Sequence, residues 1–288
     1  MLLSVATILV SILAVYQSFV GDDLLRDSLH SSLPGSSLYR AQGFFNISMT
    51  FAYSFGILLC FYFSRFLQEG VCNKWNLVTG LCNAIALYLT FTRGAWLAVF
   101  CALLFMVILQ AKKYLPVFLS GFTILFSALY GLSSSFRMRL ATLFESGFES
   151  NRYRTQLWQA NWEIFKDNPW FGVGYRMNDR LQEAYYQQLG ITDYITGHAH
   201  NTYLQFLAGL GVGGLLLLLA LKWSWWVKAY RSFQKYKSWQ ALAFLGAVLV
   251  LSIGGLTECN FQDTEVKHMF LFLYAVFISD HWRRQNVA

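Results

Sequence analysis

The sequence predicts an all-α polytopic membrane protein, and two observations lead to this prediction. The first is composition: hydrophobic residues make up 56% of the 288 residues and charged residues only 13%, whereas a typical soluble domain has about 25% charged residues. The second is that long apolar runs follow one another, interrupted by only three prolines. Because hydrocarbon cannot satisfy open backbone groups, such runs are expected to cross a bilayer as helices.

Eight segments have about the 20 mostly apolar residues that a spanning helix needs. They are residues 1–19, 45–66, 76–92, 94–111, 115–133, 202–222, 239–256 and 267–281. The third and the eighth are short for a span. The first lacks a basic start and a cleavage site, so we interpret it as a span rather than a signal peptide. All eight are predicted to form one integral membrane domain over residues 1–288.

The connections between the spans differ in length. Residues 92–95 (TRGA) and 111–113 (AKK) are predicted to be tight turns, and residues 20–44 form a medium loop. Residues 134–201 form one long polar segment, which is too long for a simple loop between two spans. We therefore expect this segment to have structure of its own.

An amphipathic helix is predicted inside the long polar segment, over NRYRTQLWQANWEIFKDNP. Its large apolar residues repeat at helical spacing: Leu157, Trp158, Trp162 and Phe165. Pro169 is expected to end it. Tyr153 and Trp158 would let this helix lie at the level of the lipid headgroups, where aromatic residues are enriched.

The distribution of basic residues predicts the orientation. If the N-terminus is cytoplasmic, the short inner segments hold 11 basic and two acidic residues, and the outer segments hold 11 basic and 13 acidic residues. Such an excess in short inner loops follows the positive-inside rule. The long polar segment and the TRGA turn then face outward, which in a bacterial-type cell is the periplasm. The net charge of +7 is thus assigned to orientation, and no nucleic-acid partner is expected.

Three arginines are candidates for binding an anion. Arg93 lies between two spans, and a charge near membrane depth usually has a partner or an anionic ligand; the alternative is an arginine that extends to the interface. Arg152 and Arg154 precede the amphipathic helix, and the planar guanidinium fork suits phosphate oxygens. The alternative for these two is a solvated loop charge.

Two histidines stand directly before the sixth span. His198 and His200 alternate, so they would share one face of an extended chain. A histidine is the usual general base near neutral pH, but either residue could also be an incidental boundary residue. Two metal ligands are a further alternative, although no third ligand with clear spacing is evident. The five cysteines form no CxxC or Cys/His cluster, so we expect neither a metal nor another cofactor.

Two further groups of residues have an open role. Gly209, Gly211, Gly213 and Gly214 follow at close spacing in the sixth span and are interpreted as helix packing, because no strand precedes them. Between the last two spans, three acidic residues could orient a histidine or bind a cation. Solvated loop charge or structural pairing is the simpler role for them: Glu258, Asp263 and Glu265.

Four motifs follow one another along the chain: YRAQGFFNISMTFAY, FTRGAWLA, RTQLWQANWEIFKDNPWFGVGY and HNTYLQFLAGLGVGG. Together they resemble the O-antigen ligase/polymerase superfamily of bacterial membrane proteins, and the resemblance covers about residues 38–275. YRAQGFFNISMTFAY is similar to its Arg-x-x-Gly-Phe-Phe stretch, and FTRGAWLA to its Ser/Thr-Arg-Gly-x-x-Leu motif. RTQLWQANWEIFKDNPWFGVGY is similar to its Arg-x-x-x-Trp helix with Pro-x-x-Gly-x-Gly. The ligase pattern of His, Asn, nine residues, Gly, two residues and Gly is matched by His200, Asn201, Gly211 and Gly214.

The resemblance implies an inverting, metal-independent glycosyltransferase with a GT-C-like fold in the bacterial inner membrane, its active site facing the periplasm. Its donor is a glycan on undecaprenyl pyrophosphate, and in ligases the acceptor is the lipid A-core oligosaccharide. By motif position, Arg93 and Arg154 hold the pyrophosphate and His200 is the general base. Supporting roles are expected for the remaining candidates: Arg40, Arg152, Arg176, His198 and Asn201. Gly211 and Gly214 are expected to pack helices.

Three alternatives stay open at this point. An O-antigen polymerase shares the chemistry and takes a glycan acceptor, while the complete histidine–glycine pattern favours a ligase. A carrier or channel for an anionic lipid or solute should show interrupted spans with polar groups at the midplane, whereas the candidates here collect at one outer face. Members of the superfamily usually have more spans than the eight predicted here, so we expect a fragment, a late start or a compact variant.

Overall fold

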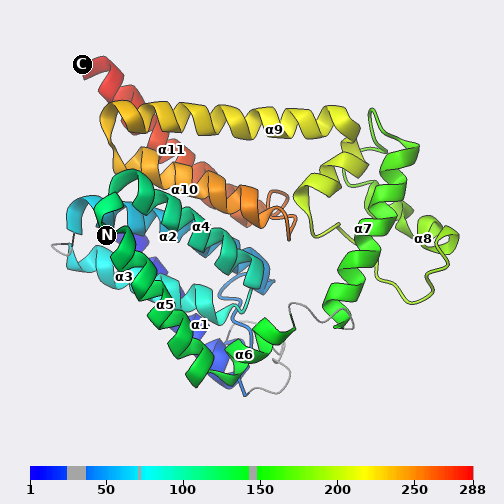
Figure 1. Ribbon diagram of the computed structural model, residues 1–288, viewed down its shortest axis with the longest axis horizontal. Helices are drawn as coiled ribbons and strands as arrows, with labels where there is room; N and C mark the ends of the chain where they lie inside the picture. The colour runs from blue at the N-terminus through cyan, green and yellow to red at the C-terminus, as the bar shows by residue number, and fades with distance from the viewer. Residues whose placement is uncertain (25–36, 71–72, 143–147, 288) are drawn as a thin grey trace.

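The computed structural model describes residues 1–24, 37–70, 73–142 and 148–287, and in these residues the chain consists of helices and connecting loops (Figure 1). The elements are α1 (Leu2–Val20), α2 (Ser48–Glu69), α3 (Lys74–Leu89), α4 (Arg93–Gln110), the 3-10 turn η2 (Lys112–Tyr114), α5 (Leu115–Leu132), α6 (Ser134–Ala141), α7 (Glu149–Asp167), α8 (Asn178–Gln188), α9 (Thr202–Tyr236), α10 (Trp239–Gly254) and α11 (Thr264–Val287). Parts of the medium loop, and Cys72, lie outside the described residues.

The helices confirm the polytopic class. Among the described residues, five are long and apolar enough to cross a membrane: α1, α2, α4, η2 with α5, and α9. The other predicted spans are helices as well, but α3 and α10 have 16 residues each, and α11 carries charges at both ends. The number of eight spans therefore stays a prediction.

The centre of the bundle is formed by α2 and α10, with α4 packed against both. The buried residues of α4 include the small Ala95, Ala98 and Ala102, and Met106 lies opposite Gly246 of α10. Small residues let helix backbones approach closely in a membrane. A helix that is apolar on all sides is expected in such a centre, and α10 fits this description with eleven buried residues among its 16.

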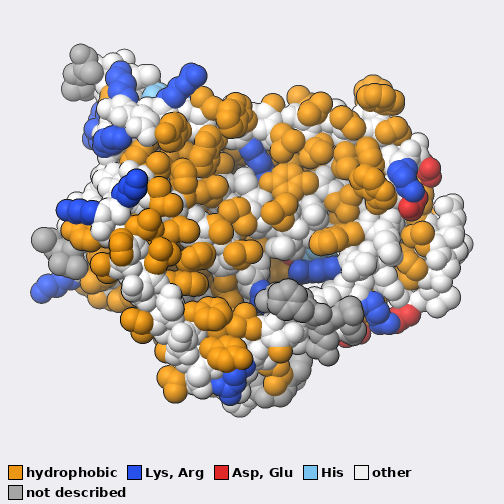
Figure 2. All heavy atoms as spheres, in the orientation of Figure 1, with side chains coloured by type: hydrophobic (Ala, Val, Ile, Leu, Met, Phe, Trp, Pro, Cys, Tyr) orange, Lys and Arg blue, Asp and Glu red, His pale blue; other side chains and the backbone are white. Residues whose placement is uncertain are grey.

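The outer helices leave apolar surface uncovered. None of the residues of α5, all of them described, is buried, although its mean hydropathy with η2 is 1.8. Figure 2 shows apolar side chains over the middle of the molecule and Lys and Arg side chains gathered at the end that holds the C-terminus. An apolar middle with polar ends is the surface that a bilayer requires.

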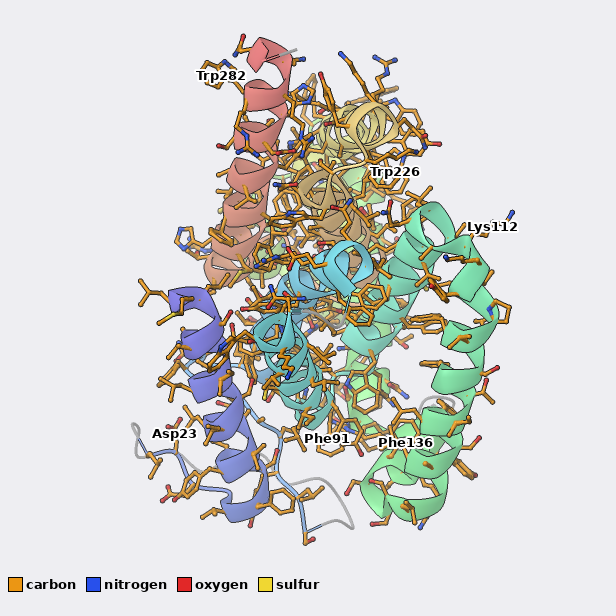
Figure 3. The ribbon with its side chains drawn as sticks, turned by 90° about the vertical axis from the view of Figure 1, so that its left-hand side faces the viewer. Asp23, Phe91, Lys112, Phe136, Trp226 and Trp282 are labelled. Carbon is orange, nitrogen blue, oxygen red and sulfur yellow. The ribbon has the colours of Figure 1, made fainter. Side chains whose placement is uncertain are left out.

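The connections fall at two opposite ends, as the predicted alternation of loops requires. Lys112, Trp226 and Trp282 lie toward one end of the bundle, while Phe91 and Phe136 lie toward the other (Figure 3). The second end also carries the turn between α3 and α4, which lies at residues 90–92 and not at residues 92–95 as predicted, because α4 already begins at Arg93. We call these the basic end and the His200 end; which of them is cytoplasmic stays a prediction.

The sixth predicted span is wrong in its C-terminal boundary. The helix was expected to stop near residue 222, but α9 continues to Tyr236, so the predicted inner loop shrinks to residues 237–238. Residues 223–236 contain neither glycine nor proline, and nothing in them interrupts the backbone hydrogen bonds. The helix ends where Lys237 adopts φ 50° in the left-handed region.

The amphipathic helix of the long polar segment is confirmed as α7, and Pro169 follows its end. The predicted apolar face is only partly right. The buried residues are Leu157, Ala160, Asn161 and Ile164, whereas Trp158 and Trp162 are 38% and 49% exposed. The buried face packs against α8 and α9, and the side-chain amide of Asn178 in α8 donates to Asn161 at 2.6 Å.

Candidate active site

A sharp bend divides α9 into two limbs, residues 202–210 and 212–236. Gly211 has φ 66° and ψ −169°, a combination that essentially only glycine adopts. The hydroxyl of Tyr203 consequently lies 3.2 Å from Nζ of Lys222, 19 residues away, although a straight helix would separate them by about 28 Å. The short limb therefore folds back along the long limb and returns the chain toward α10.

Two glycine-rich segments meet at this bend, residues 169–174 and residues 209–214. The backbone N–H of Val212 donates to the carbonyl of Pro169 at 2.8 Å, and that of Gly174 donates to the carbonyl of Gly209 at 2.8 Å. The proline–glycine motif after α7 and the glycine motif of α9 are therefore two halves of one backbone contact.

The glycines are required by this close approach. A Cβ at Gly211 would lie 2.3 Å from the carbonyl oxygen of Trp170, and one at Gly172 would lie 2.4 Å from the carbonyl carbon of Gly209. A Cβ at Gly214 would lie 2.2 Å from Cβ of Leu210, inside the bend itself. Gly211 and Gly214 thus serve the bend and its contact with the loop after α7, whereas the sequence analysis expected them to pack helices against one another.

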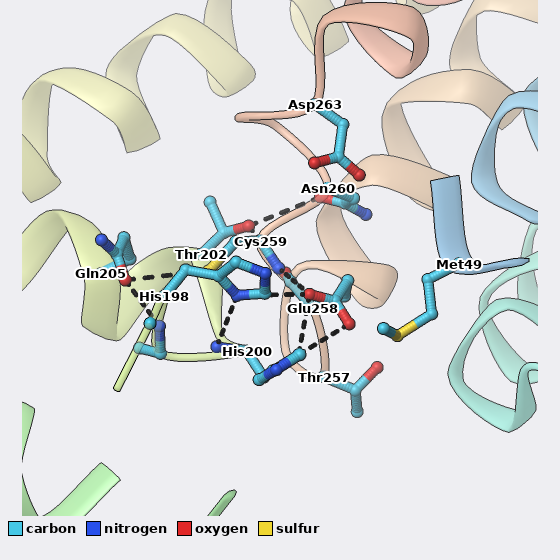
Figure 4. Close-up of polar contacts among 12 residues, drawn as sticks. Met49, His198, His200, Thr202, Gln205, Thr257, Glu258, Cys259, Asn260 and Asp263 are labelled. Atoms are coloured by element: carbon cyan, nitrogen blue, oxygen red, sulfur yellow. Dashed lines mark hydrogen bonds and ion pairs between the residues drawn. The ribbon is translucent and has the colours of Figure 1, made fainter. Parts of the chain in front are cut away.

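His200 meets a carboxylate from a distant loop (Figure 4). Its Nδ1 lies 2.9 Å from Oε2 and 3.0 Å from Oε1 of Glu258, which belongs to the loop between α10 and α11. The start of α9 is tied to the same loop, because the Thr202 hydroxyl donates to the Glu258 carbonyl at 2.9 Å. A carboxylate at Nδ1 fixes the ring and leaves Nε2 as the nitrogen that can accept a proton.

The backbone of His200 is in the left-handed region, with φ 46°. Only a few per cent of non-glycine residues adopt this conformation. It is held from both sides: the carbonyl of Ala199 accepts from Nε1 of Trp158 at 2.8 Å, and Asn201 caps α9 by accepting from the N–H of Tyr203 at 3.0 Å. Strained residues of this kind cluster at functional sites.

Glu258 is buried, with 3% of its surface exposed, and it is held as an anion. Burial by itself would raise its pKa, but the hydrogen bond from His200 and the charges of His200 and Arg154 lower the pKa below its usual value. Nη2 of Arg154 lies 3.7 Å from Oε2. Glu258 therefore connects the two histidines with the arginine at the start of α7.

His198 is not equivalent to His200. Its Nδ1 accepts a hydrogen bond from the backbone N–H of His200 at 3.3 Å, so this nitrogen carries no proton. Burial lowers the pKa of His198 below its usual value, and the opposing effect of Glu258 does not reverse this. A neutral His198 packed 4.2 Å from the His200 ring shapes the site, while the contact with the carboxylate belongs to His200.

Arg93 reaches across from α4 to the segment that contains α6 and α7. Its Nη1 donates to the hydroxyl of Thr142 at 2.9 Å and to the carbonyl of Arg139 at 3.2 Å. Its Nη2 contacts Oδ1 of Asn151 at 3.5 Å. These contacts favour an arginine fixed in the protein over one that extends to the membrane interface.

Two more arginines point into the same region. Arg40 donates to the Thr90 carbonyl at 3.0 Å and to the Thr92 hydroxyl at 3.1 Å. Burial and the charges of Arg139, Arg154 and Arg93 together lower the pKa of Arg40 to about 10. Burial and the charges of Arg93 and Arg154 likewise lower the pKa of Arg139 to about 10. We call Arg40, Arg93, Arg139 and Arg154 the arginine cluster.

The cluster has an excess of positive charge. Each of its arginines comes from a different element, and Glu258 is the carboxylate that acts on Arg40 and contacts Arg154. Nε of Arg139 is buried and has no hydrogen-bond partner in the described part of the chain. Buried charges of one sign are costly unless a partner neutralises them. The arrangement therefore suits an anion with several oxygen atoms.

An aromatic cluster holds α6, and with it Arg139, against α3 and α4. The ring of Phe136 stacks on Trp96 with centroids 5.6 Å apart, and Trp96 stacks on Tyr88 at 5.5 Å. Phe91 packs against both Tyr88 and Trp96. These rings fix the short helix that brings Arg139 to Arg93.

The remaining sequence candidates lie around the site. Arg152 pairs with Asp193 at 2.7 Å and is 44% exposed, so its contacts are in the outer loop and not with Glu258. Arg176 lies 3.8 Å from Asp179, and its charge acts on His198. The side chain of Asn201 is engaged in capping α9. Of these three, only Arg176 is positioned to act on a histidine of the site.

The candidate metal site has three ligand residues in the structure, whereas the sequence indicated only two. Ligand atoms of His198, His200 and Glu258 lie within 4.8 Å of one another. The third ligand, Glu258, lies in a loop 58 residues after His200, so spacing in the sequence cannot reveal it. The guanidinium of Arg154 already supplies positive charge to the same carboxylate, and this competes with a cation.

Sequence reasoning passed over two residues of this site. Glu258 was considered as a histidine-orienting group, but solvated charge was preferred; its position directly before buried Cys259 and Asn260 was the available signal. Arg139 was not singled out. It alternates with Arg137 on α6, and no local pattern distinguishes the half-buried arginine from the exposed one.

Comparison with known protein families gives one match. Residues 78–219 match the family model described as O-antigen ligase. The matched range begins in α3 and ends in the long limb of α9, so it contains Arg93, Arg139, Arg154 and His200, but neither Arg40 nor Glu258. No curated protein sequence matches the chain.

Proposed function

The chain belongs to the O-antigen ligase/polymerase superfamily, and from this premise we propose that it is an inverting, metal-independent glycosyltransferase of the bacterial inner membrane. It transfers a glycan from undecaprenyl pyrophosphate to the lipid A-core oligosaccharide on the periplasmic side. The observation that carries the proposal is buried Glu258, which pairs with His200 and also contacts Arg154 of the arginine cluster.

The proposed reaction is a single displacement. Nε2 of His200 accepts the proton of the acceptor hydroxyl, and Glu258 stabilises the imidazolium that forms. The acceptor oxygen attacks the anomeric carbon while the bond from this carbon to the pyrophosphate oxygen breaks. The electron pair leaves with the lipid pyrophosphate, so cleavage of the bond between the sugar and the pyrophosphate supplies the driving force and no nucleotide is needed.

The arginine cluster would stabilise the leaving group. Charge develops on the pyrophosphate as the bond breaks, and fixed donors aimed at this charge lower the barrier. Arg93 and Arg154 are the proposed direct ligands, and the buried Nε of Arg139 offers a further donor. Arg40, held by Thr90 and Thr92, adds positive charge behind them.

Complementation tests the function and separates the two enzyme types. The chain is expressed in a ligase-null strain and in a polymerase-null strain, and lipopolysaccharide is analysed on gels. We expect long lipopolysaccharide to return in the ligase-null strain alone. Recovery in the polymerase-null strain alone would assign a glycan acceptor instead, and recovery in neither would contradict the proposal.

Metal dependence tests the chemistry. With purified protein and lipid-linked donor, transfer should persist after chelation with EDTA. Added Zn²⁺ should inhibit, because His198, His200 and Glu258 could bind it and the base would then be occupied. Transfer that needs a divalent ion would reject the role of His200 as a free base.

A further inference from the structure

A groove of about 530 Å³ lies at the basic end of the molecule, between α9 and the C-terminal part of α11. Figure 1 shows these two helices meeting near the C-terminus. The groove is on the long limb of α9, far along the chain from His200, and the proposed reaction does not use it. Its lining combines basic residues, aromatic residues and His281.

Three cations line the groove from one side. Lys228, Arg231 and Lys235 are spaced by three and four residues, so they lie on one face of α9. All three are exposed. In the described part of the chain no carboxylate lies within ion-pair distance of any of them, and no acidic residue lines the groove.

The nearest carboxylate along α11 is already engaged. Asp280 is buried and accepts from Arg283 at 3.1 Å and from Arg284 at 2.9 Å. The floor of the groove is closed by a hydrogen bond of 3.0 Å between Nδ1 of His281 and the hydroxyl of Ser232. The three cations therefore surround a formed concavity without a negative partner.

The same face of α9 becomes apolar in the direction of the membrane. Trp223 and Val227 line the groove beside the cations. One heptad further back, Leu216 and Leu217 are 60% and 74% exposed. A continuous strip thus runs from exposed leucine through tryptophan to lysine and arginine, which is the order of an acyl chain, an interface and a charged headgroup.

We propose that this groove is a binding site for an anionic phospholipid of the surrounding bilayer, with its phosphate between Lys228, Arg231 and Lys235 and an acyl chain along Trp223. Basic pockets between spanning helices hold lipid phosphates in this way. The strip of apolar residues favours a lipid over a free anion, since a small anion would use only the basic part. This site is independent of the glycosyltransferase reaction.

The test measures which lipids the full chain retains. Wild-type protein is placed in nanodiscs that mix phosphatidylglycerol with phosphatidylcholine, extracted in detergent and analysed by native mass spectrometry. The groove variant carries Lys228→Gln, Arg231→Gln and Lys235→Gln. A matched control carries Lys74→Gln, Lys112→Gln and Lys113→Gln, which removes the same charge from exposed lysines of the same end.

We expect wild type and control to retain phosphatidylglycerol preferentially. The groove variant should lose this preference by one to two orders of magnitude, since each basic residue near a lipid phosphate contributes about a fivefold effect. Equal losses in the two triple variants, or retention in the groove variant, would reject the site. If the triple variant does not fold, single variants should each weaken retention about fivefold, and unchanged retention in all of them would reject it as well.

A second arm separates the lipid from a free anion. Inorganic phosphate is titrated against the retained phosphatidylglycerol, and Trp223→Ala removes the apolar contact while keeping the cations. A bound lipid should resist displacement in wild type and be lost more readily from the Trp223→Ala variant. Complete displacement by phosphate with no effect of Trp223→Ala would identify a small-anion site and overturn the proposal.

Discussion

The two ends of the molecule both collect basic side chains, but they do so by different means. At the His200 end, Arg93, Arg139 and Arg154 come from α4, α6 and α7 and are partly buried near one another, and Arg154 also contacts Glu258. At the basic end, the cations of the groove follow one another on a single helix and remain exposed. The first arrangement needs tertiary structure to exist, whereas the second needs only a helix.

This difference in how the basic residues are arranged suits the two ends to different proposed activities, catalysis at the His200 end and lipid binding at the basic end. Convergent, desolvated charges in a rigid site can stabilise a charge that develops during a reaction. Exposed charges on one helix face bind an anionic surface more weakly and are screened by salt. Variants that break the tertiary contacts should therefore affect the two ends unequally.

The largest expected effect concerns the proposed base. His200→Ala should lower glycan transfer by about 10³-fold, because a general base contributes roughly 10²–10⁴. Its neighbour His198→Ala serves as the control and should lose much less, since only His200 pairs closely with Glu258. Transfer and membrane insertion are measured together, and an active, correctly inserted His200→Ala protein would remove His200 from this role.

The second prediction concerns the bend in α9, where a substitution should affect the His200 end of the molecule and leave the basic end unchanged. Gly211→Ala introduces a Cβ 2.3 Å from the Trp170 carbonyl at φ 66°, which should cost about 3 kcal/mol or more. We expect transfer to fall at least tenfold, with phosphatidylglycerol retention in the groove unchanged. Gly213→Ala is the matched control, because its Cβ would make an ordinary contact at 3.5 Å. Equal behaviour of the two variants would show that the bend does not position the site.

A variant of Arg139 tests whether arginines from separate helices act together in binding the donor. Arg139→Met should reduce transfer by about tenfold or more, since one hydrogen bond to a charged group contributes roughly 1.5–3 kcal/mol. Arg137→Met, two residues away on the same helix and exposed, should have little effect. Initial rates at varied donor concentration make the comparison, and similar rates for both variants would exclude Arg139 from donor binding.

The smallest effect concerns the loop that carries Glu258. Burial raises the pKa of Asp263 from 3.8 to about 6, so the folded state binds more protons than the unfolded state between these values. Stability therefore falls as the pH rises through this window and stays lower above it. Asp263→Asn, which keeps an acceptor for Thr50, should raise the Tm by a few degrees at pH 7.5 and by less at pH 4.5.

The control for this variant is Glu265→Gln, an exposed change in the first turn of α11. It should leave the Tm unchanged at both pH values. Thermal unfolding in detergent gives the comparison. A Tm for Asp263→Asn that is raised equally at both pH values would indicate a packing effect without any contribution from ionisation.

The sequence predicted some parts of the molecule well. Apolar runs located helices at all eight predicted spans, and the amphipathic pattern and Pro169 located α7. It did not predict the full length of α9, because hydropathy falls at residue 223 while nothing there breaks a helix. It also did not show which face of α7 is buried, since packing against α8 and α9 decided this.

The sequence by itself determined the class of the protein, the order of its helices and the residue types that could bind phosphate, because these depend on hydropathy and on contacts within a few residues. Only the tertiary structure decided which of those residues act together. The fold-back at Gly211 and the loop before α11 bring His200 within 2.9 Å of Glu258, 58 residues away. The packing of Phe136 brings Arg139 to Arg93. Such pairs depend on close packing between separate elements, and no local pattern encodes them.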